Sequence, residues 1–244
     1  MKFISMLALA SVMVSVAMPL QARTTMSATR IVIAGAGGEG GLEVGNLDSQ
    51  PALVQAWIDD GRADMPPERM DTPFQVLPPL ARIEAQASLP LRIAVVKPAV
   101  LPTDRESLYW FNMIEIPRAT PGAGGVATTT SAQLQLLVRS RIKLIFRPAD
   151  LQGDPARAIG QLRWHWSQDG RSLTVANSTP WVVSLNTVAI GDQAATGLDD
   201  GSVLPQGSRK LDFARPPGHG QAIEFEWIDD WGAIRKATAV ARAD

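Results

Sequence analysis

The stretch LPTDRESLYWFNMIEIP, from Leu101 to Pro117, carries the strongest fold signal in this chain of 244 residues. After the charged triplet at 104–106, apolar residues follow one another almost without interruption until Pro117. This run is too continuously apolar for a strand with one face in water. It therefore predicts a strand buried inside a β-sandwich.

A second run, LQLLVRSRIKLIFRPADL, covers residues 134–151. The segment between the two runs has neither core-forming side chains nor a helical period, and is interpreted as a hairpin connection. Within the second run, Leu134, Leu136 and Val138 are spaced by two, so they share one face of an extended strand. On the pattern alone, that face points into the strand's own domain.

Outside these two runs the chain consists of short apolar segments that end at Pro, Gly or Asp, and it offers no long amphipathic helix with caps. This pattern predicts an all-β fold. A break near residue 150 divides the chain into two predicted β-sandwich domains, 23–150 and 151–244. The remaining predicted strands are Leu53–Asp59, Phe74–Leu77, Leu91–Val96, Gln161–Trp166, Ser172–Ala176, Trp181–Val188, Leu211–Phe213 and Ala222–Trp227.

The first 22 residues have the pattern of a secretory signal peptide. Lys2 precedes a short apolar stretch with small residues, and a cleavage point is expected before Arg23. After it, residues 29–33 predict an edge strand. The glycine-rich segment 34–46 follows that strand but is not followed by a helix, as a dinucleotide-binding loop requires. It is interpreted as a connection.

Composition excludes several classes of function. The net charge is -1 and no basic face is visible, so nucleic acid is not expected as a partner. Cysteine is absent, which rules out disulfides and thiol nucleophiles. The two histidines, His165 and His219, lack the neighbours of a catalytic triad or a metal site. We therefore expect neither an enzyme nor a cofactor.

The stretch 101–117 resembles the signature of the periplasmic pilus-assembly chaperones, the family of the P-pilus and type 1 pilus chaperones. The matching positions are Pro102, Asp104, Arg105, Glu106, Ser107, Leu108, Trp110, Asn112, Ile116 and Pro117. Further matches lie at Thr29-Arg30, Gln55-Ala56-Trp57, Pro78-Pro79, Ile142-Lys143-Leu144, Phe146-Arg147-Pro148, Asn177, Thr179-Pro180 and Asp230-Trp231-Gly232. The resemblance implies two immunoglobulin-like domains in an L or boomerang arrangement.

The resemblance also implies a function and a set of site residues. In this family a strand of the first domain, here 134–143, completes the sheet of a pilin subunit that lacks a strand, with Leu134, Leu136 and Val138 filling the subunit's groove. The pairing of such chaperones with pilins is an established example of β-strand addition. Arg30 and Lys143 match the pair that holds the subunit's terminal carboxylate. The subunit is then delivered to an outer-membrane usher from the periplasm.

Four further residues, Arg92, Glu106, Arg147 and Asp230, match an ionic cluster that ties the two domains together in the family. The resemblance leaves open which subunits and usher are served, and whether the free protein self-associates. It also leaves the subfamily open, because the connection 117–133 is longer than in short-loop members while the cysteine pair of long-loop members is missing.

An alternative from another class is a secreted two-domain adhesion or carbohydrate-binding module. In that interpretation Trp57, Trp110, Trp164 and Trp166 would be platforms on which sugar rings stack. The two hypotheses differ in a simple observable. A chaperone is recovered from the periplasm bound to a strand-deficient subunit, whereas an adhesion module binds glycans alone.

Overall fold

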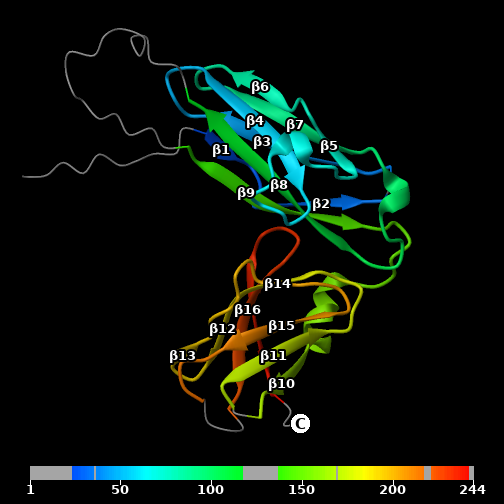
Figure 1. Cartoon of the computed structure of the whole chain (residues 1–244), viewed down its shortest axis with the longest axis vertical. Helices are drawn as coiled ribbons and strands as arrows, with labels where there is room; N and C mark the ends of the chain where they lie inside the picture. The colour runs from blue at the N-terminus through cyan, green and yellow to red at the C-terminus, as the bar shows by residue number, and fades with distance from the viewer. Residues whose placement is uncertain (1–23, 36, 118–136, 169, 217–220, 242–244) are drawn as a thin grey trace, which may run out of the picture.

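The computed structural model describes residues 24–35, 37–117, 137–168, 170–216 and 221–241. The predicted signal peptide, the connection between the two apolar runs, Leu134 and Leu136 all lie outside these ranges. The chain is all-β and folds into two immunoglobulin-like β-sandwich domains, which meet at an angle (Figure 1). No helix within the described ranges has the length and apolar character needed to cross a membrane.

The N-terminal domain consists of two sheets. One sheet has the order β1 (Thr24–Met26), β3 (Glu39–Asn46), β7 (Ser88–Val95) and β5 (Phe74–Leu77). The other has the order β2 (Arg30–Ala34), β9 (Arg139–Arg147), β8 (Ser107–Ile116), β4 (Ala52–Asp59) and β6 (Leu80–Ile83). Neighbouring strands are antiparallel except for β2 and β9, which are parallel. Two short 3-10 helices, η1 (Pro67–Arg69) and η2 (Pro98–Val100), lie in the loops.

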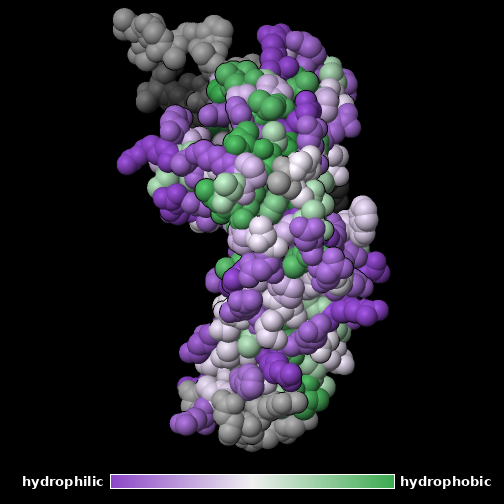
Figure 2. Space-filling view, turned by 90° about the vertical axis from the view of Figure 1, so that its right-hand side faces the viewer, coloured by the Kyte–Doolittle hydropathy of each residue, from purple (hydrophilic) through white to green (hydrophobic). Residues whose placement is uncertain are grey.

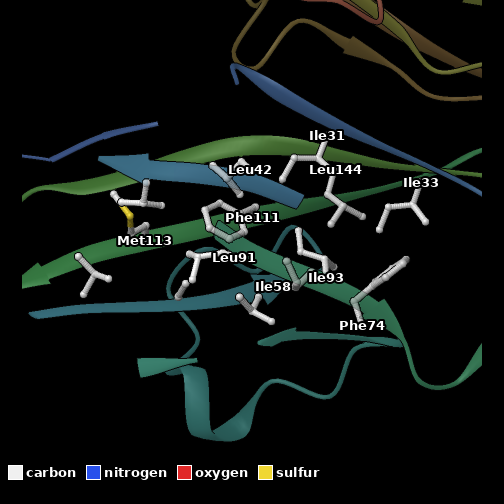
Figure 3. Packing of buried hydrophobic residues seen from close by; sticks show 14 of the residues in the cluster. Ile31, Ile33, Leu42, Ile58, Phe74, Leu91, Ile93, Phe111, Met113 and Leu144 are labelled. Carbon is white, nitrogen blue, oxygen red and sulfur yellow. The ribbon is translucent and has the colours of Figure 1, made fainter. Parts of the chain in front are cut away.

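The strand predicted within 101–117 is confirmed as β8, at the centre of the second sheet. Phe111 and Met113 point into the space between the sheets, where they pack with Leu91 and Leu144 (Figure 3). On the opposite face of β8, Trp110 and Asn112 are buried as well. The continuous apolar run therefore reflects burial of both faces at the middle of the strand.

The interpretation of 34–46 as a connection was wrong, because most of this segment is strand β3. Leu42 and Val44 are buried in the core, and β3 pairs with β7 along nearly its whole length. The glycines allow this close packing: a Cβ at Gly40 would lie 2.7 Å from Ile33 Cγ1. A larger residue there would force β3 away from the facing sheet, so glycine marks a tight approach and not a loop.

The C-terminal domain begins with η3 (Pro155–Gln161) and has its own core, separate from the first. One sheet has the order β10 (Arg163–Trp166), β11 (Ser172–Asn177) and β15 (Gly207–Asp212). The other has the order β13 (Gln193–Ala194), β12 (Val183–Ile190), β16 (Ile223–Ile228) and β17 (Ile234–Ala239), with β14 (Ser202–Val203) also paired to β12. The strands predicted in this half correspond to β10, β11, β12, β15 and β16.

The surfaces of the two domains differ in hydropathy on the face shown in Figure 2. Figure 2 shows hydrophobic residues gathered on this face of the N-terminal domain, whereas the same face of the C-terminal domain is mainly hydrophilic. On this face, the N-terminal domain is therefore the one with apolar surface to offer a partner.

Candidate functional site: the interdomain cleft and the adjoining strand edge

Two buried cations, Arg30 and Lys143, lie at the junction of the domains. Arg30 begins β2 and Lys143 is its register partner in β9, so the parallel pairing of these strands places the two residues side by side. Arg30 is 9% exposed and Lys143 is 8% exposed. The structure thus brings together the two residues that the sequence predicted as an anchor pair.

Each cation contacts the C-terminal domain through a neutral group. Arg30 Nη1 donates to the carbonyl oxygen of Ile228 at 2.9 Å, and Lys143 Nζ donates to Ser184 Oγ at 3.0 Å. The Nε of Arg30 is buried and has no hydrogen-bond partner. No carboxylate in the described ranges forms an ion pair with either cation. A buried positive charge without a counterion is costly, so this arrangement favours an incoming anion.

The pKa values agree with this geometry. Burial lowers the pKa of Lys143 to about 8, with Asp200 acting in the opposite direction and the charges of Arg30 and Arg209 lowering it further. Burial also lowers the pKa of Arg30, although Asp230 and Asp229 oppose the shift. A carboxylate placed between Arg30 and Lys143 would stabilise both charged forms.

A cavity of about 370 Å³ opens beside Arg30, on the side of the C-terminal domain. Its walls combine the cation with apolar and aromatic side chains. The residues that line it are Arg30, Asp154, Pro155, Ala156, Ile159, Val182, Val183, Ser184, Trp227, Ile228, Asp229, Asp230, Trp231 and Arg235. Since Ser184 is also the hydrogen-bond partner of Lys143, this cavity adjoins both cations. No group of three or more His, Cys, Asp or Glu that could hold a metal occurs in the described ranges.

Three of the four residues predicted as an interdomain ionic cluster meet. Arg147 Nε donates to Glu106 Oε1 at 2.7 Å, and Arg147 Nη2 donates to Asp230 Oδ2 at 2.8 Å. The backbone N–H of Val182 donates to Glu106 Oε2 at 2.6 Å. Burial raises the pKa of Glu106 against the opposing charge of Arg147 and the hydrogen bond from Val182. These contacts connect the N-terminal domain to two separate loops of the C-terminal domain.

The fourth residue, Arg92, is not part of this cluster, which corrects the prediction. Arg92 lies in β7 between Leu91 and Ile93, which are both buried in the core. Because strand side chains alternate between faces, Arg92 points to solvent on the other sheet, where it pairs with Glu39. A match to the family's positions does not say which sheet face an arginine occupies, whereas the alternation of Leu91, Arg92 and Ile93 was a sequence signal for it.

We expect replacement of Asp230 by alanine to loosen the domain junction. The carboxylate is partly exposed and Arg147 keeps Glu106 as a partner, so the cost in unfolding free energy should be about 1 kcal/mol. Small-angle scattering should show a wider range of interdomain angles, with a small fall in melting temperature. Asp192→Ala, which breaks an exposed pair with Arg215, is the control. Identical profiles for the two variants would contradict a joint role for the cluster.

Leading away from the cleft, β9 has an open edge. β2 pairs only with residues 143–147 of β9, whereas β8 pairs with β9 from Arg139 onward. No described strand pairs with the outer edge of β9 between Arg139 and Ile142. Just before it, Val138 is 65% exposed. Unpaired backbone groups beside exposed apolar side chains form a template onto which another strand can add.

A buried carboxylate, which the sequence patterns did not single out, holds β9 at this edge. Asp59, in β4, is 0% exposed and accepts hydrogen bonds from Arg141 Nη2 at 2.7 Å, Arg141 Nε at 2.9 Å, Arg139 Nη2 at 3.1 Å and Asn112 Nδ2 at 2.8 Å. Burial alone would raise the pKa of Asp59, but hydrogen bonds from Arg141, Asn112 and the Gly61 N–H lower it. The signal in the sequence for such a charged contact was the period-two spacing of Arg139, Arg141 and Lys143, which places all three on one face of the strand.

The tryptophans proposed as sugar platforms pack against other side chains, with Trp110 and Trp164 buried and Trp57 and Trp166 half-buried. The guanidinium of Arg139 lies 5.0 Å from the ring centroid of Trp57, and that of Arg141 lies 3.9 Å from the centroid of Trp110. In the C-terminal domain the two remaining rings, Trp164 and Trp166, pack against Phe225 and Phe213. The arrangement needed for the carbohydrate-binding alternative is therefore not present at these four residues.

We expect Asp59→Asn to destabilise the protein by about 1–3 kcal/mol, because the amide leaves two arginines underpaired and itself donates where an acceptor is needed. Denaturant unfolding measures the loss, and hydrogen exchange should show faster opening of β9. The adjacent Asp60→Asn is the matched control, since Asp60 forms only a surface pair with Arg62. Equal stabilities of the two variants would exclude a special role for Asp59.

The fold and this site define a class of protein: a two-domain immunoglobulin-like β-sandwich whose open sheet edge leads into a cleft with two buried cations that form no ion pair within the described ranges. Such an edge can accept an added strand. Family models place the chain more narrowly. The model described as "Pili and flagellar-assembly chaperone, PapD N-terminal domain" matches residues 23–152, and the one described as "Pili assembly chaperone PapD, C-terminal domain" matches residues 157–239. The chain belongs to the pili assembly chaperone family.

Individual relatives agree with this assignment. The chain is 36% identical over 232 residues to the chaperone protein FimB/FhaD of Bordetella pertussis, covering 92% of this chain and 91% of that protein. The solved CupB2 chaperone of Pseudomonas aeruginosa is similar with a TM-score of 0.72 and 34% identity, covering 89% of this chain and 100% of that one. The SafB chaperone of Salmonella enterica, solved in complex with the SafA pilin, has a TM-score of 0.73 and 33% identity over 89% and 95% of the two chains.

Proposed function

We propose that this chaperone binds pilin-type fimbrial subunits in the periplasm, completes their sheet with its own β9 strand and delivers them to an outer-membrane usher. The observation that carries the proposal is the continuity of the open β9 edge with a cleft that holds two buried cations, neither of which forms an ion pair with a carboxylate of the described ranges. The similarity to SafB, which was solved in complex with the SafA pilin, supports a pilin as the partner. The signal-like N-terminus supports the periplasm.

Arg30 and Lys143 would bind the terminal carboxylate of the subunit. The guanidinium offers a planar pair of donors and the ammonium a compact charge, so together they can orient both carboxylate oxygens. Since a chain has only one α-carboxylate, at its C-terminus, this contact also sets the register of every residue that precedes it. The subunit strand would then run along the free edge of β9 and pair with its backbone.

The donor residues follow from the same register. Val138, Leu136 and Leu134 have the parity of Ile142, which packs against the domain's own core. When β9 extends toward the subunit, these side chains would enter the subunit's sandwich in the place of its missing strand. Arg139 and Arg141, on the opposite face, would stay bound to Asp59 and keep the edge straight.

In the free protein the same edge would be open to unwanted pairing with another chain. Val138 and Leu137 are exposed next to unpaired backbone groups, and such edges tend to pair with one another. We therefore expect the chaperone to self-associate weakly through β9 when no subunit is bound. Subunits would compete with that contact.

Purification from the periplasm of a piliated bacterium tests the proposal. Mass spectrometry of the material that travels with the tagged chaperone should identify small β-rich polypeptides, and these should be lost when β9 is altered. Recovery of the chaperone alone, together with binding to immobilised glycans, would overturn the proposal in favour of an adhesion module.

A further inference from the structure

An exposed tryptophan stands beside the cleft, in the turn between β16 and β17. Trp231 is 92% exposed, which is the highest value among the large apolar side chains of the described ranges. Its two neighbours in the sequence both contact the N-terminal domain. Asp230 pairs with Arg147, and Gly232 lies against Thr29, where an added Cβ would be 2.4 Å from Thr29 Oγ1. Trp231 itself, being almost fully exposed, contributes little to joining the domains.

The turn that carries this tryptophan is held firmly by Asp229. Its Oδ1 accepts the backbone N–H groups of Trp231 at 3.0 Å and Ala233 at 2.9 Å, and its Oδ2 accepts from Arg235 Nε at 2.9 Å. Gly232 adopts a φ of +84°, which other residues rarely reach. A large apolar side chain on such an ordered turn loses little conformational freedom when a partner covers it.

Trp231 and Arg30 line the same cavity, together with Trp227 and Ile159. Three carboxylates also line it, but each is already engaged. Asp230 is paired with Arg147, Asp229 holds the turn, and Asp154 accepts the backbone N–H of Ala156. The unsatisfied group is the buried Nε of Arg30. The cavity therefore fits a ligand with one carboxylate and an adjoining apolar side chain.

We propose that Trp231 forms a side-chain subsite for the last residues of the bound subunit and selects an aromatic or large aliphatic side chain next to the terminal carboxylate. This inference rests on the proposed function, in which Arg30 and Lys143 hold that carboxylate. The cation pair then recognises that a chain ends, and Trp231 recognises which residue ends it. A ring or a branched aliphatic group would cover the exposed indole and the apolar wall of the cavity.

Three synthetic peptides test the subsite with the full-length mature chaperone. Each has about twelve residues with alternating apolar side chains, long enough to pair along β9. They end in phenylalanine with a free carboxylate, in alanine with a free carboxylate, and in phenylalanine amide. We expect the wild-type protein to bind the first roughly tenfold more tightly than the second, and Trp231→Ala to remove that preference. Leu47→Ala, which removes an exposed apolar side chain that does not line the cavity, is the matched control.

Fluorescence gives an independent readout. Subtracting the emission spectrum of Trp231→Phe from that of the wild type isolates the emission of Trp231. This emission should shift to shorter wavelength when the peptide ending in phenylalanine with a free carboxylate binds, and iodide should quench it less. If the two free acids bind equally and both exceed the amide, the carboxylate anchor stands and the subsite is refuted. If the amide binds as tightly as the acid, or if no peptide binds, the anchor itself is refuted and the subsite with it.

Discussion

Replacing Lys143 with methionine is expected to weaken subunit binding by about 2–5 kcal/mol, because one of two charge-assisted contacts to a desolvated carboxylate is lost. The methionine keeps the apolar stem and removes a buried charge that no carboxylate of the described ranges pairs with. The melting temperature should therefore stay at or above that of the wild type. Subunit yield in the periplasm and thermal melting, measured on one preparation, check both parts.

Lys236→Met is the matched control, since Lys236 is an exposed lysine in β17, outside the cleft. It should leave subunit yield unchanged. A folded Lys143→Met protein that captures subunits at the wild-type yield would show that the cleft cation does not anchor the subunit.

The pKa of Lys143 adds a pH dependence with a defined sign. In the free protein this pKa lies at about 8, so Lys143 loses its proton above that pH, whereas a bound carboxylate would raise the value. Affinity for the subunit should fall as the pH rises above about 8. The contribution of Lys143 to folding stability has the opposite slope. The pKa of Lys143 in the unfolded chain is 10.5, so between pH values of about 8 and 10.5 the unfolded chain binds more protons than the folded chain, and stability rises with pH. Lys143→Arg should remove both dependences.

Leu136→Asp should abolish subunit capture while the chaperone stays folded. On the donor interpretation the new carboxylate meets water in the free protein but would have to enter the apolar groove of the subunit, at a cost of several kcal/mol. On the alternative interpretation Leu136 belongs to its own domain's core, and the same substitution would unfold a protein whose total stability is about 5–15 kcal/mol.

The melting curve and the subunit yield of Leu136→Asp separate these interpretations. Gln135→Asp is the control, because its side chain has the opposite parity and should not enter the subunit groove. Loss of both folding and capture would favour the core interpretation. Wild-type behaviour in both measurements would refute the donor assignment.

The class of fold follows from the amino-acid sequence without any structure. Short apolar runs ending in Pro, Gly or Asp specify strands locally, since period, propensity and breakers act within a few residues. β4, β5, β8 and β11 accordingly lie within a residue or two of the predicted runs, apart from residues 101–106 of the 101–117 stretch, which precede β8. The glycine-rich β3 was missed because its glycines serve a packing contact with β2, and that contact involves a different segment of the chain.

Which charges meet, in contrast, depends on the tertiary fold. Arg30 and Lys143 lie far apart in the sequence and become neighbours through a parallel pairing that no local pattern specifies. Asp59 joins Arg139 and Arg141 across three strands, and Arg92 points away from the cluster to which the resemblance assigned it. An ion pair depends on register and on sheet face, and a shift of one residue reverses every side chain. Strand identity is local, whereas the site arises from the assembly of strands.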